Sequence, residues 1–184
     1  MEIVPKSEGE KIMPVVALRE GVVFPHTEAV LTFSRPKSNA GVMAAFKGDK
    51  QIVIVSQRDR EMEDPKKEDI YEVGTWCVID RILTTEGEIH ALVKGVARVK
   101  LSELVSTDPF LVGRVTEMAE VVENTDEAKA ASKHLASEFR RAVSLGKSVD
   151  YMVFIKLMSG VEGAELVDQI AYALEAKAEE KQKV

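Results

Sequence analysis

The segment TWCVIDRILTTEGEIHALVKGVARVKL, residues 75–101, decides how this chain folds. Two runs rich in β-branched residues, 75–83 and 88–101, flank the dipeptide Glu86-Gly87. A two-residue link whose second residue is glycine suits a tight hairpin turn, because glycine tolerates a positive φ. Gly95, within the second run, indicates a bulge or a sharp bend, which a closed barrel needs at its corners. The segment therefore predicts a long hairpin within a mostly antiparallel sheet or barrel.

Other short apolar runs continue this strand pattern through the first two thirds of the chain. Turn signals bound each run, and the runs predict strands at 12–18, 28–33, 52–57 and 110–121. A short helix is expected at 36–46, with Ser34 as its cap, Pro36 in its first turn and Gly48 after its end. The polar stretch 58–69 contains a proline and has no apolar period, so it should form an exposed loop.

The period of the apolar residues becomes helical near residue 122. They recur every three or four positions over 128–142, which predicts an amphipathic helix that ends at Gly146. The run 149–158 is apolar nearly all round, as expected for a helix buried between its neighbours. A third helix is expected over 166–174, and three helices with short links make a small bundle.

The two patterns together predict an α+β protein with two parts. Residues 1–122 should form a mostly antiparallel β pseudo-barrel, and residues 123–184 a small helical bundle that leads into a further helix. A chain of 184 residues is long enough to give each part its own core.

Composition and charge narrow the classes of partner. The net charge is −6 and the basic residues are scattered among acids, whereas phosphate binding needs clustered Lys and Arg, so no nucleic acid is expected as a partner. No apolar run approaches the roughly 20 residues that span a bilayer, and the acidic start is unlike a secretory signal. We therefore expect a cytoplasmic protein with no membrane partner. Cys77 is the single cysteine, which excludes an intrachain disulfide and offers no framework for structural zinc.

Four ordered segments resemble one protein family. They are 14–26 (PVVALREGVVFPH), 70–75 (IYEVGT), 93–99 (VKGVARV) and 168–171 (DQIA). Together they resemble the N-terminal domain of Lon-type ATP-dependent proteases over about residues 12–175. The resemblance implies a barrel like that of pseudouridine synthase and archaeosine transglycosylase, followed by a helical bundle. It also implies a role in selecting unfolded or tagged protein substrates and in supporting a hexameric, ATP-driven protease.

Catalytic machinery is not expected in this chain. It has no G-x-x-x-x-G-K-[ST] loop to hold phosphates, and no serine in the protease motif of the family. The three histidines, His26, His90 and His134, have neither metal-ligand spacing nor a recognisable acid–base partner, so no catalytic, cofactor or metal residue is assigned. The helix-prone, charged end at 174–181 favours truncation of a longer protein, whose Ser-Lys protease module and ATPase module, with ATP and Mg²⁺, are absent here.

Residue pairing across the predicted hairpin identifies candidate substrate contacts. Pairing outward from the turn places on one face Thr85–Glu88, Leu83–His90, Arg81–Leu92 and Ile79–Lys94, and on the other Thr84–Ile89, Ile82–Ala91 and Asp80–Val93. The second face is more apolar and should face the core. Leu83 and Leu92 then lie on the more polar face, where exposed apolar residues are typical of a surface that binds hydrophobic segments. An equal alternative is that a neighbouring loop or helix covers them. Phe24 and Pro25, in the link before the second strand, are further candidate contacts.

Three functions compete at this point. The first is a non-catalytic domain that recognises protein substrates for its own ATPase and protease modules. The second is a stand-alone adaptor of the same fold that binds a dedicated protein or small ligand. The third, RNA binding, rests on the barrel type alone, and the acidic charge opposes it.

Overall fold

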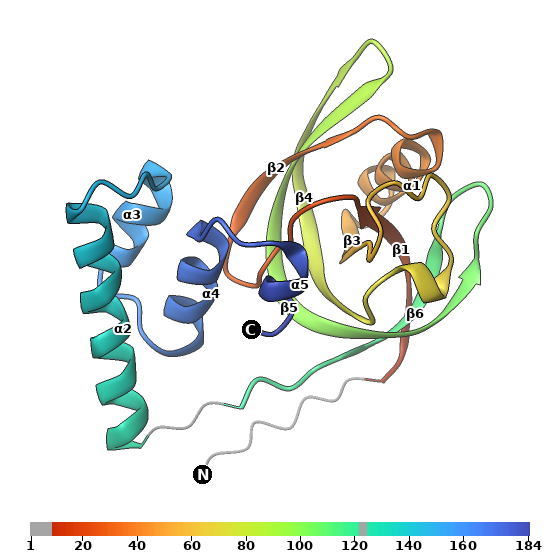
Figure 1. Ribbon diagram of the computed structural model, residues 1–184. Helices are drawn as coiled ribbons and strands as arrows, with labels where there is room; N and C mark the ends of the chain where they lie inside the picture. Colours follow the sequence, from red (N-terminus) through yellow and green to blue (C-terminus); the bar gives the residue numbers. More distant parts are fainter. Residues whose placement is uncertain (1–8, 122–124) are drawn as a thin grey trace.

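The computed structural model describes residues 9–121 and 125–184, which form a barrel-like sheet with a helical bundle beside it (Figure 1). The elements in chain order are β1 (Lys11–Leu18), β2 (Glu28–Phe33), α1 (Pro36–Lys47), β3 (Gln51–Ser56), a 3-10 turn (Lys67–Asp69), β4 (Val73–Thr85), β5 (Glu88–Ser106), β6 (Val112–Glu117), α2 (Asp126–Ser144), α3 (Tyr151–Met158), α4 (Gly163–Ala173) and α5 (Ala178–Lys181). The expected α+β class, with a β pseudo-barrel followed by a helical bundle, is confirmed.

One mixed sheet of six strands makes the barrel. The strand order is β2-β5-β4-β3-β1-β6, and β6 also pairs with β5, which closes the sheet on itself. Every pairing is antiparallel except that of β1 with β3. β5 can serve two partners on one edge because it is 19 residues long: its first half pairs with β2 and its second half with β6.

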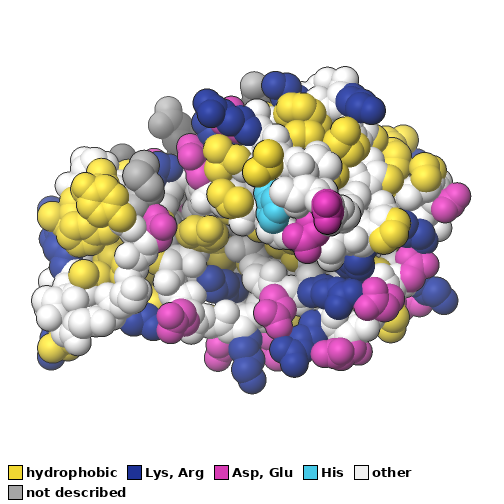
Figure 2. All heavy atoms as spheres, turned by 90° about the horizontal axis from the view of Figure 1, so that it is seen from above, with side chains coloured by type: hydrophobic (Ala, Val, Ile, Leu, Met, Phe, Trp, Pro, Cys, Tyr) yellow, Lys and Arg dark blue, Asp and Glu magenta, His cyan; other side chains and the backbone are white. Residues whose placement is uncertain are grey.

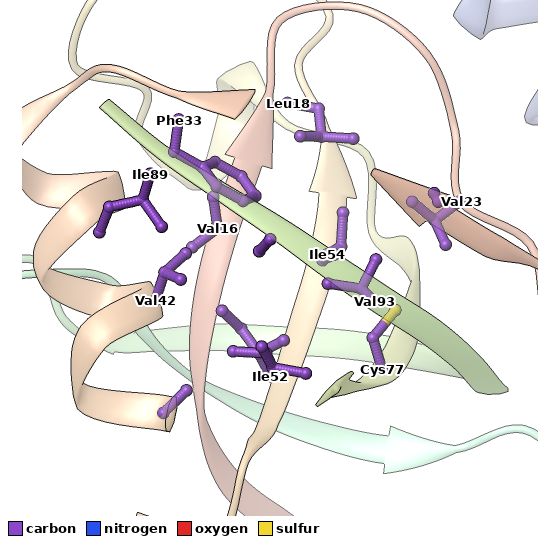
Figure 3. Close-up of a cluster of buried hydrophobic side chains, with 14 residues drawn as sticks. Val16, Leu18, Val23, Phe33, Val42, Ile52, Ile54, Cys77, Ile89 and Val93 are labelled. Carbon is purple, nitrogen blue, oxygen red and sulfur yellow. The ribbon is translucent and has the colours of Figure 1, made fainter. Parts of the chain in front are cut away.

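Both faces of β1 and β3 are buried, which explains why their sequences are apolar without alternation. Val16 and Ile54 point into a cluster that also contains Val42 of α1 and Val93 of β5 (Figure 3). Their neighbours in sequence, such as Val53, face a second cluster with the end of β5 and with β6. Cys77 is fully buried in the first cluster, as expected for a small apolar residue.

Two details of the expected barrel differ from the structure. Ser34 was the expected cap of the first helix, but Arg35 occupies the N-cap position of α1 and makes no side-chain capping bond. The Arg35 side chain instead donates to the carbonyl of Ala17 and to Oε1 of Gln57, at 2.6 Å in the latter case, so it tethers the helix start to β1 and to the end of β3. The strand expected at 110–121 is shorter, because β6 runs only over the residues that pair with β1 and β5.

The helical part has its own small core. Phe139 of α2, Val153 and Leu157 of α3, and Leu166 and Ile170 of α4 pack together. The run 149–158 was expected to be buried nearly all round, and this expectation is wrong for one side of α3, where side chains are exposed. The predicted boundary between residues 122 and 123 lies outside the described residues. No helix within 9–121 and 125–184 is both long and apolar enough to cross a bilayer.

Candidate functional site

The β4–β5 hairpin projects from the barrel and carries the candidate surface (Figure 1). Its turn is Glu86-Gly87, and Gly87 has a φ of 79°, a value that glycine adopts without strain. Close to the turn the pairing is the predicted one, with Leu83 opposite His90 and Arg81 opposite Leu92. The two leucines are therefore diagonal neighbours on the same outer face of the sheet.

β2 extends this outer face with a third apolar residue. Val30 is the direct partner of Leu92 on the other side of β5. Val30 is 70% exposed and Leu83 is 64% exposed, while Leu92 between them is partly buried. We call these three residues, Val30, Leu83 and Leu92, the hairpin patch. Seen from the hairpin end, the molecule shows hydrophobic side chains gathered beside a histidine (Figure 2).

Polar pairs border the hairpin patch along the strands. Toward the turn, the His90 ring lies 2.9 Å from the hydroxyl of Thr32 and 3.3 Å from that of Thr85. In the other direction, Lys94 and Glu28 form an ion pair of 3.6 Å across β5 and β2. An apolar centre with a polar border is the usual anatomy of a protein-binding surface.

Beyond Arg81 the predicted register is wrong by one residue. The sequence pairing placed Ile79 opposite Lys94 and Asp80 opposite Val93, but the structure pairs Ile79 with Val93 and leaves Asp80 in a β-bulge. A bulge inserts one residue into one strand and so moves the side chains that follow it to the other face, here as far as Cys77, where a second irregularity before Trp76 restores the predicted pairing. Ile79 is consequently fully buried in the core and not on the outer face.

Phe24 and Pro25, the other two candidate contacts, are buried. A β-carbon added to Gly95 would lie only 2.0 Å from the carbonyl oxygen of Phe24, so this glycine lets the link approach β5 directly. Backbone bonds hold the link in place: His26 donates to Gly95 at 3.0 Å, and Gly95 donates to Thr27 at 2.9 Å. Phe24 and Pro25 are therefore not available as surface contacts in this structure.

The same link joins the barrel to the helical bundle, a role that the sequence did not predict. The carbonyl of His26 accepts hydrogen bonds from Gln169 of α4 at 2.5 Å and from Lys156 of α3 at 2.8 Å. Beside it, Arg98 of β5 donates to Asp168 of α4 at 2.5 Å, and the Asp168 side chain is only 1% exposed. Burial raises the pKa of Asp168, and the guanidinium of Arg98 opposes that shift.

This joint brings together three of the four segments that carry the family resemblance. Arg98 and Gly95 come from 93–99, His26 from 14–26, and Asp168 with Gln169 from 168–171. The sequence held a usable signal for this joint in Asp168 and Gln169, an acid and an amide on the apolar side of a helix. Such groups are buried only when they have hydrogen-bond partners. Within 9–121 and 125–184 no group of three or more His, Cys, Asp or Glu side chains could hold a metal ion.

The exposed side of α3 is a second apolar surface that sequence periodicity missed. Tyr151 is 72% exposed, Met158 51% and Ile155 44%. Because the run 149–158 is apolar on every side, its sequence does not distinguish the side facing Leu166 from the side facing water.

Both the sequence and the architecture match known proteins. The family model described as the ATP-dependent protease La (LON) substrate-binding domain matches residues 12–184. A Lon protease of Syntrophomonas wolfei is 31% identical over 173 residues, which are 94% of this chain and 21% of that protein. Lon protease 2 of Desulfotalea psychrophila is 32% identical over 175 residues, 95% of this chain and 23% of that protein. The chain thus spans about a fifth of the length of the curated relatives it matches.

Two solved structures share the fold. The N-terminal domain of the Mycobacterium avium complex Lon protease superimposes with a TM-score of 0.70 and 20% identity, over 94% of this chain and 88% of that one. A Lon N-terminal domain protein from Xanthomonas campestris superimposes with a TM-score of 0.63 and 14% identity, over the same shares of the two chains.

Proposed function

The chain belongs to the family of LON substrate-binding domains, and from this premise we propose that it recognises unfolded or tagged protein segments through the hairpin patch. It does so without chemistry of its own, for an ATP-dependent Ser-Lys protease of which it is one part. ATP and Mg²⁺ belong to the ATPase module of that protease. The observation that carries the proposal is the row formed by Val30, Leu92 and Leu83 on the outer face of the barrel.

The geometry of the patch suits an extended hydrophobic segment. Val30 and Leu83 belong to strands on either side of β5, so the patch crosses three strands that are spaced about 4.8 Å apart. Its two outer members are mostly exposed, so binding a substrate could remove most of their apolar surface from water. Full burial of such a side chain contributes about 1.5–3 kcal/mol.

A competing location is the exposed side of α3, and a set of variants separates the two. Leu83→Ser and Val30→Ser alter the hairpin patch, whereas Ile155→Ser alters α3. Val105→Ser is a matched control, because Val105 lies on β5 and is 45% exposed but is distant in sequence from the patch residues. The probe is a reduced and alkylated protein that cannot fold, labelled for fluorescence anisotropy.

We expect Leu83→Ser and Val30→Ser each to cost about 1–2 kcal/mol of binding free energy, roughly a five- to thirtyfold rise in Kd. Val105→Ser should bind as the unaltered chain does. Weaker binding in Ile155→Ser alone would move the site to α3. Unchanged binding in all four variants would refute a role for either surface.

Support for a hexameric assembly is the second part of the proposal. The joint fixes the bundle to the barrel through a partly buried ion pair and two hydrogen bonds to one carbonyl, so the domain can hold a set orientation toward neighbouring subunits. Light scattering of the full-length protein with Arg98→Met is the test, and an unchanged hexamer would contradict it.

A stand-alone adaptor that binds a dedicated protein or small ligand is the alternative function. The gene sequence distinguishes the two proposals. An open reading frame that continues past Val184 into a P-loop supports the protease, and one that stops there supports the adaptor.

A further inference from the structure

β2 is the end strand of the sheet, and one of its two edges has no neighbouring strand. In the order β2-β5-β4-β3-β1-β6 its one partner among the described residues is β5. Proteins often protect such an edge with a proline, a lysine or a bulge, because unpaired backbone groups attract other chains. β2 has the sequence EAVLTF and an unbroken register with β5, so it carries none of these three protections. The edge of β2 is therefore open to pairing with another strand.

Alternate residues of β2 direct their backbone N–H and C=O groups toward this open edge. The hairpin sets the alternation: Thr85 and Glu88, on either side of the two-residue turn, form a hydrogen-bonded pair. Every second residue of β5 from Glu88 onward therefore bonds to β4, and the residues between them bond to β2. The bond of 2.9 Å from the N–H of Gly95 to the carbonyl of Thr27 fits the same alternation. The outward-facing residues of β2 are Glu28, Val30 and Thr32.

The outward backbone groups of Val30 and Thr32 have no hydrogen-bond partner within 9–121 and 125–184. Both residues are exposed, so an incoming chain can reach these groups. The end of β1, across the opening, is different: the carbonyl of Ala17 already accepts a hydrogen bond from Arg35. The structure thus blocks the edge of β1 and leaves the edge of β2 free.

A pocket of about 260 Å³ lies along the open edge. Residues 30–34 form one wall, and residues 17–20 at the end of β1 form the other. Apolar side chains of both strands, Leu18 and Phe33, line it. A chain extended beside β2 would direct alternate side chains to opposite faces. One set would lie on the outer face beside Val30, and the other set would enter this pocket.

We propose that β2 binds an extended segment of an unfolded protein as an additional, antiparallel strand. The inference rests on the proposed function and states how the substrate segment is held. Hydrogen bonds to the backbone of Val30 and Thr32 give an affinity that depends little on the substrate sequence, and apolar side chains of the segment cover the hairpin patch. A folded protein has already paired its backbone groups, so this mode of binding selects unfolded chains.

A second copy of this chain is a less suitable occupant. Stable protein interfaces bury about 1,200–2,000 Å² in total, whereas β2 is only six residues long. So short an edge suits the weak, reversible binding of a substrate segment. Sedimentation velocity tests this choice: a dimer of the unaltered chain that Thr32→Pro abolishes would replace the substrate segment with a second copy.

Thr32→Pro is the variant that tests the backbone contact. It removes an outward N–H without removing a bond to β5, because the free side of an edge strand tolerates proline. Thr32→Val keeps this N–H and loses only the hydroxyl that contacts His90, so comparison of the two variants isolates the backbone group. We expect Thr32→Pro to bind the labelled unfolded protein about five- to tenfold more weakly than Thr32→Val. Equal affinities, with both variants folded by circular dichroism, would refute the added strand.

Methylated peptides provide a second arm that does not depend on the folding of Thr32→Pro. Leucine and serine alternate in the parent peptide, and N-methyl groups are placed on the leucines in one derivative and on the serines in the other. In an antiparallel strand, the residue opposite Val30 shares its face and directs its N–H toward β2. With the leucines on the hairpin patch, methylation of the leucines should weaken binding at least about tenfold, and methylation of the serines less than about twofold. Equal binding of the two derivatives, or the reverse preference, would exclude this arrangement.

Hydrogen exchange measured by NMR reads the backbone contact directly. The amides of Val30 and Thr32 should exchange rapidly in the free protein and slowly when the parent peptide is bound. Those of Ala29 and Leu31 should exchange slowly in both states, because they bond to β5. Unchanged exchange at Val30 and Thr32 under saturating peptide would contradict the proposal.

These measurements separate the inference from the proposed function. Weaker binding by Leu83→Ser, together with equal binding of the two methylated peptides, would retain the hairpin patch as the site and overturn the added strand alone. If neither the unfolded protein nor the parent peptide binds the unaltered chain, both the proposed function and the added strand are wrong.

Discussion

Gly95→Ala is the substitution that most directly tests how the barrel and the bundle are joined. The added β-carbon would lie 2.0 Å from the carbonyl oxygen of Phe24, 2.9 Å from its carbonyl carbon and 3.1 Å from the Cα of Pro25. All three neighbours are backbone atoms, so no side chain can rotate out of the way. The link from Phe24 to Thr27 would have to move away from β5.

The expected loss of stability has two parts. Overpacking in a close-packed region costs about 1–3 kcal/mol. Displacing the link also strains two backbone bonds, from His26 to Gly95 and from Gly95 to Thr27, which contribute about 1 kcal/mol each. We therefore expect Gly95→Ala to lower the free energy of unfolding by about 3–5 kcal/mol.

Urea unfolding measures this with two probes. Trp76, the single tryptophan, lies on β4 and reports on the barrel by fluorescence, while far-ultraviolet circular dichroism reports largely on the helices. Because the His26 carbonyl binds both Lys156 and Gln169, the variant should also loosen the bundle, and the helical signal should be lost at lower urea than the fluorescence change.

Gly9→Ala is the matched control, because a β-carbon at Gly9 meets nothing within 4 Å. That variant should change stability by less than about 0.5 kcal/mol. If Gly95→Ala proves as mild as Gly9→Ala, the close approach of the link to β5 does not hold the two parts together, and the reasoning is wrong.

Three further predictions concern burial and charge. Because burial raises the pKa of Asp168, the folded protein keeps this proton at pH values where the unfolded chain has lost it, so stability falls as pH rises through that interval. The free energy of unfolding of Asp168→Asn, measured in urea, should therefore rise relative to that of the unaltered chain as pH rises from about 4 towards neutrality. The opposite slope would contradict the assignment. Burial also raises the pKa of the Cys77 thiol, so a thiol reagent should label it only as fast as the protein unfolds, and complete labelling of the native protein on mixing would exclude this. Finally, Ile79→Ala should lower the free energy of unfolding by about 2–5 kcal/mol because Ile79 is fully buried, whereas Leu83→Ala should change it by no more than about 0.5 kcal/mol. Equal losses of stability in denaturant titrations would instead support the register without the bulge.

The strands and helices were predictable because their signals are local. A glycine turn between β-branched runs specified the hairpin, and the change of apolar period separated the strands from the helices. The shared use of β5 by β2 and β6 was not predictable, since strand pairing over long sequence distances leaves no local pattern. The Asp80 bulge was missed for a related reason: a bulge is fixed by packing on both faces of the strand, and alternation alone gives no position for it.

The candidate site was predictable only in part. Leu83 and Leu92 followed from pairing near the turn, where register is set by the turn itself. Val30 was missed because its neighbour on β5 could not be identified from sequence. Phe24 and Pro25 were placed in a link whose burial depends on Gly95, a contact between segments about 70 residues apart in sequence.

The long strand β5 also has a mechanical consequence. It begins beside the hairpin patch, passes the joint at Gly95 and Arg98, and ends paired with β6. A pull applied at the hairpin along the strand axis would load the hydrogen bonds to its neighbours in shear, so many bonds would have to break together. A force perpendicular to the strand would instead break these hydrogen bonds one after another. The barrel should therefore resist a force along β5 far better than a force across it. A substrate bound at the hairpin patch, as proposed, could then be pulled in one direction without unfolding this domain.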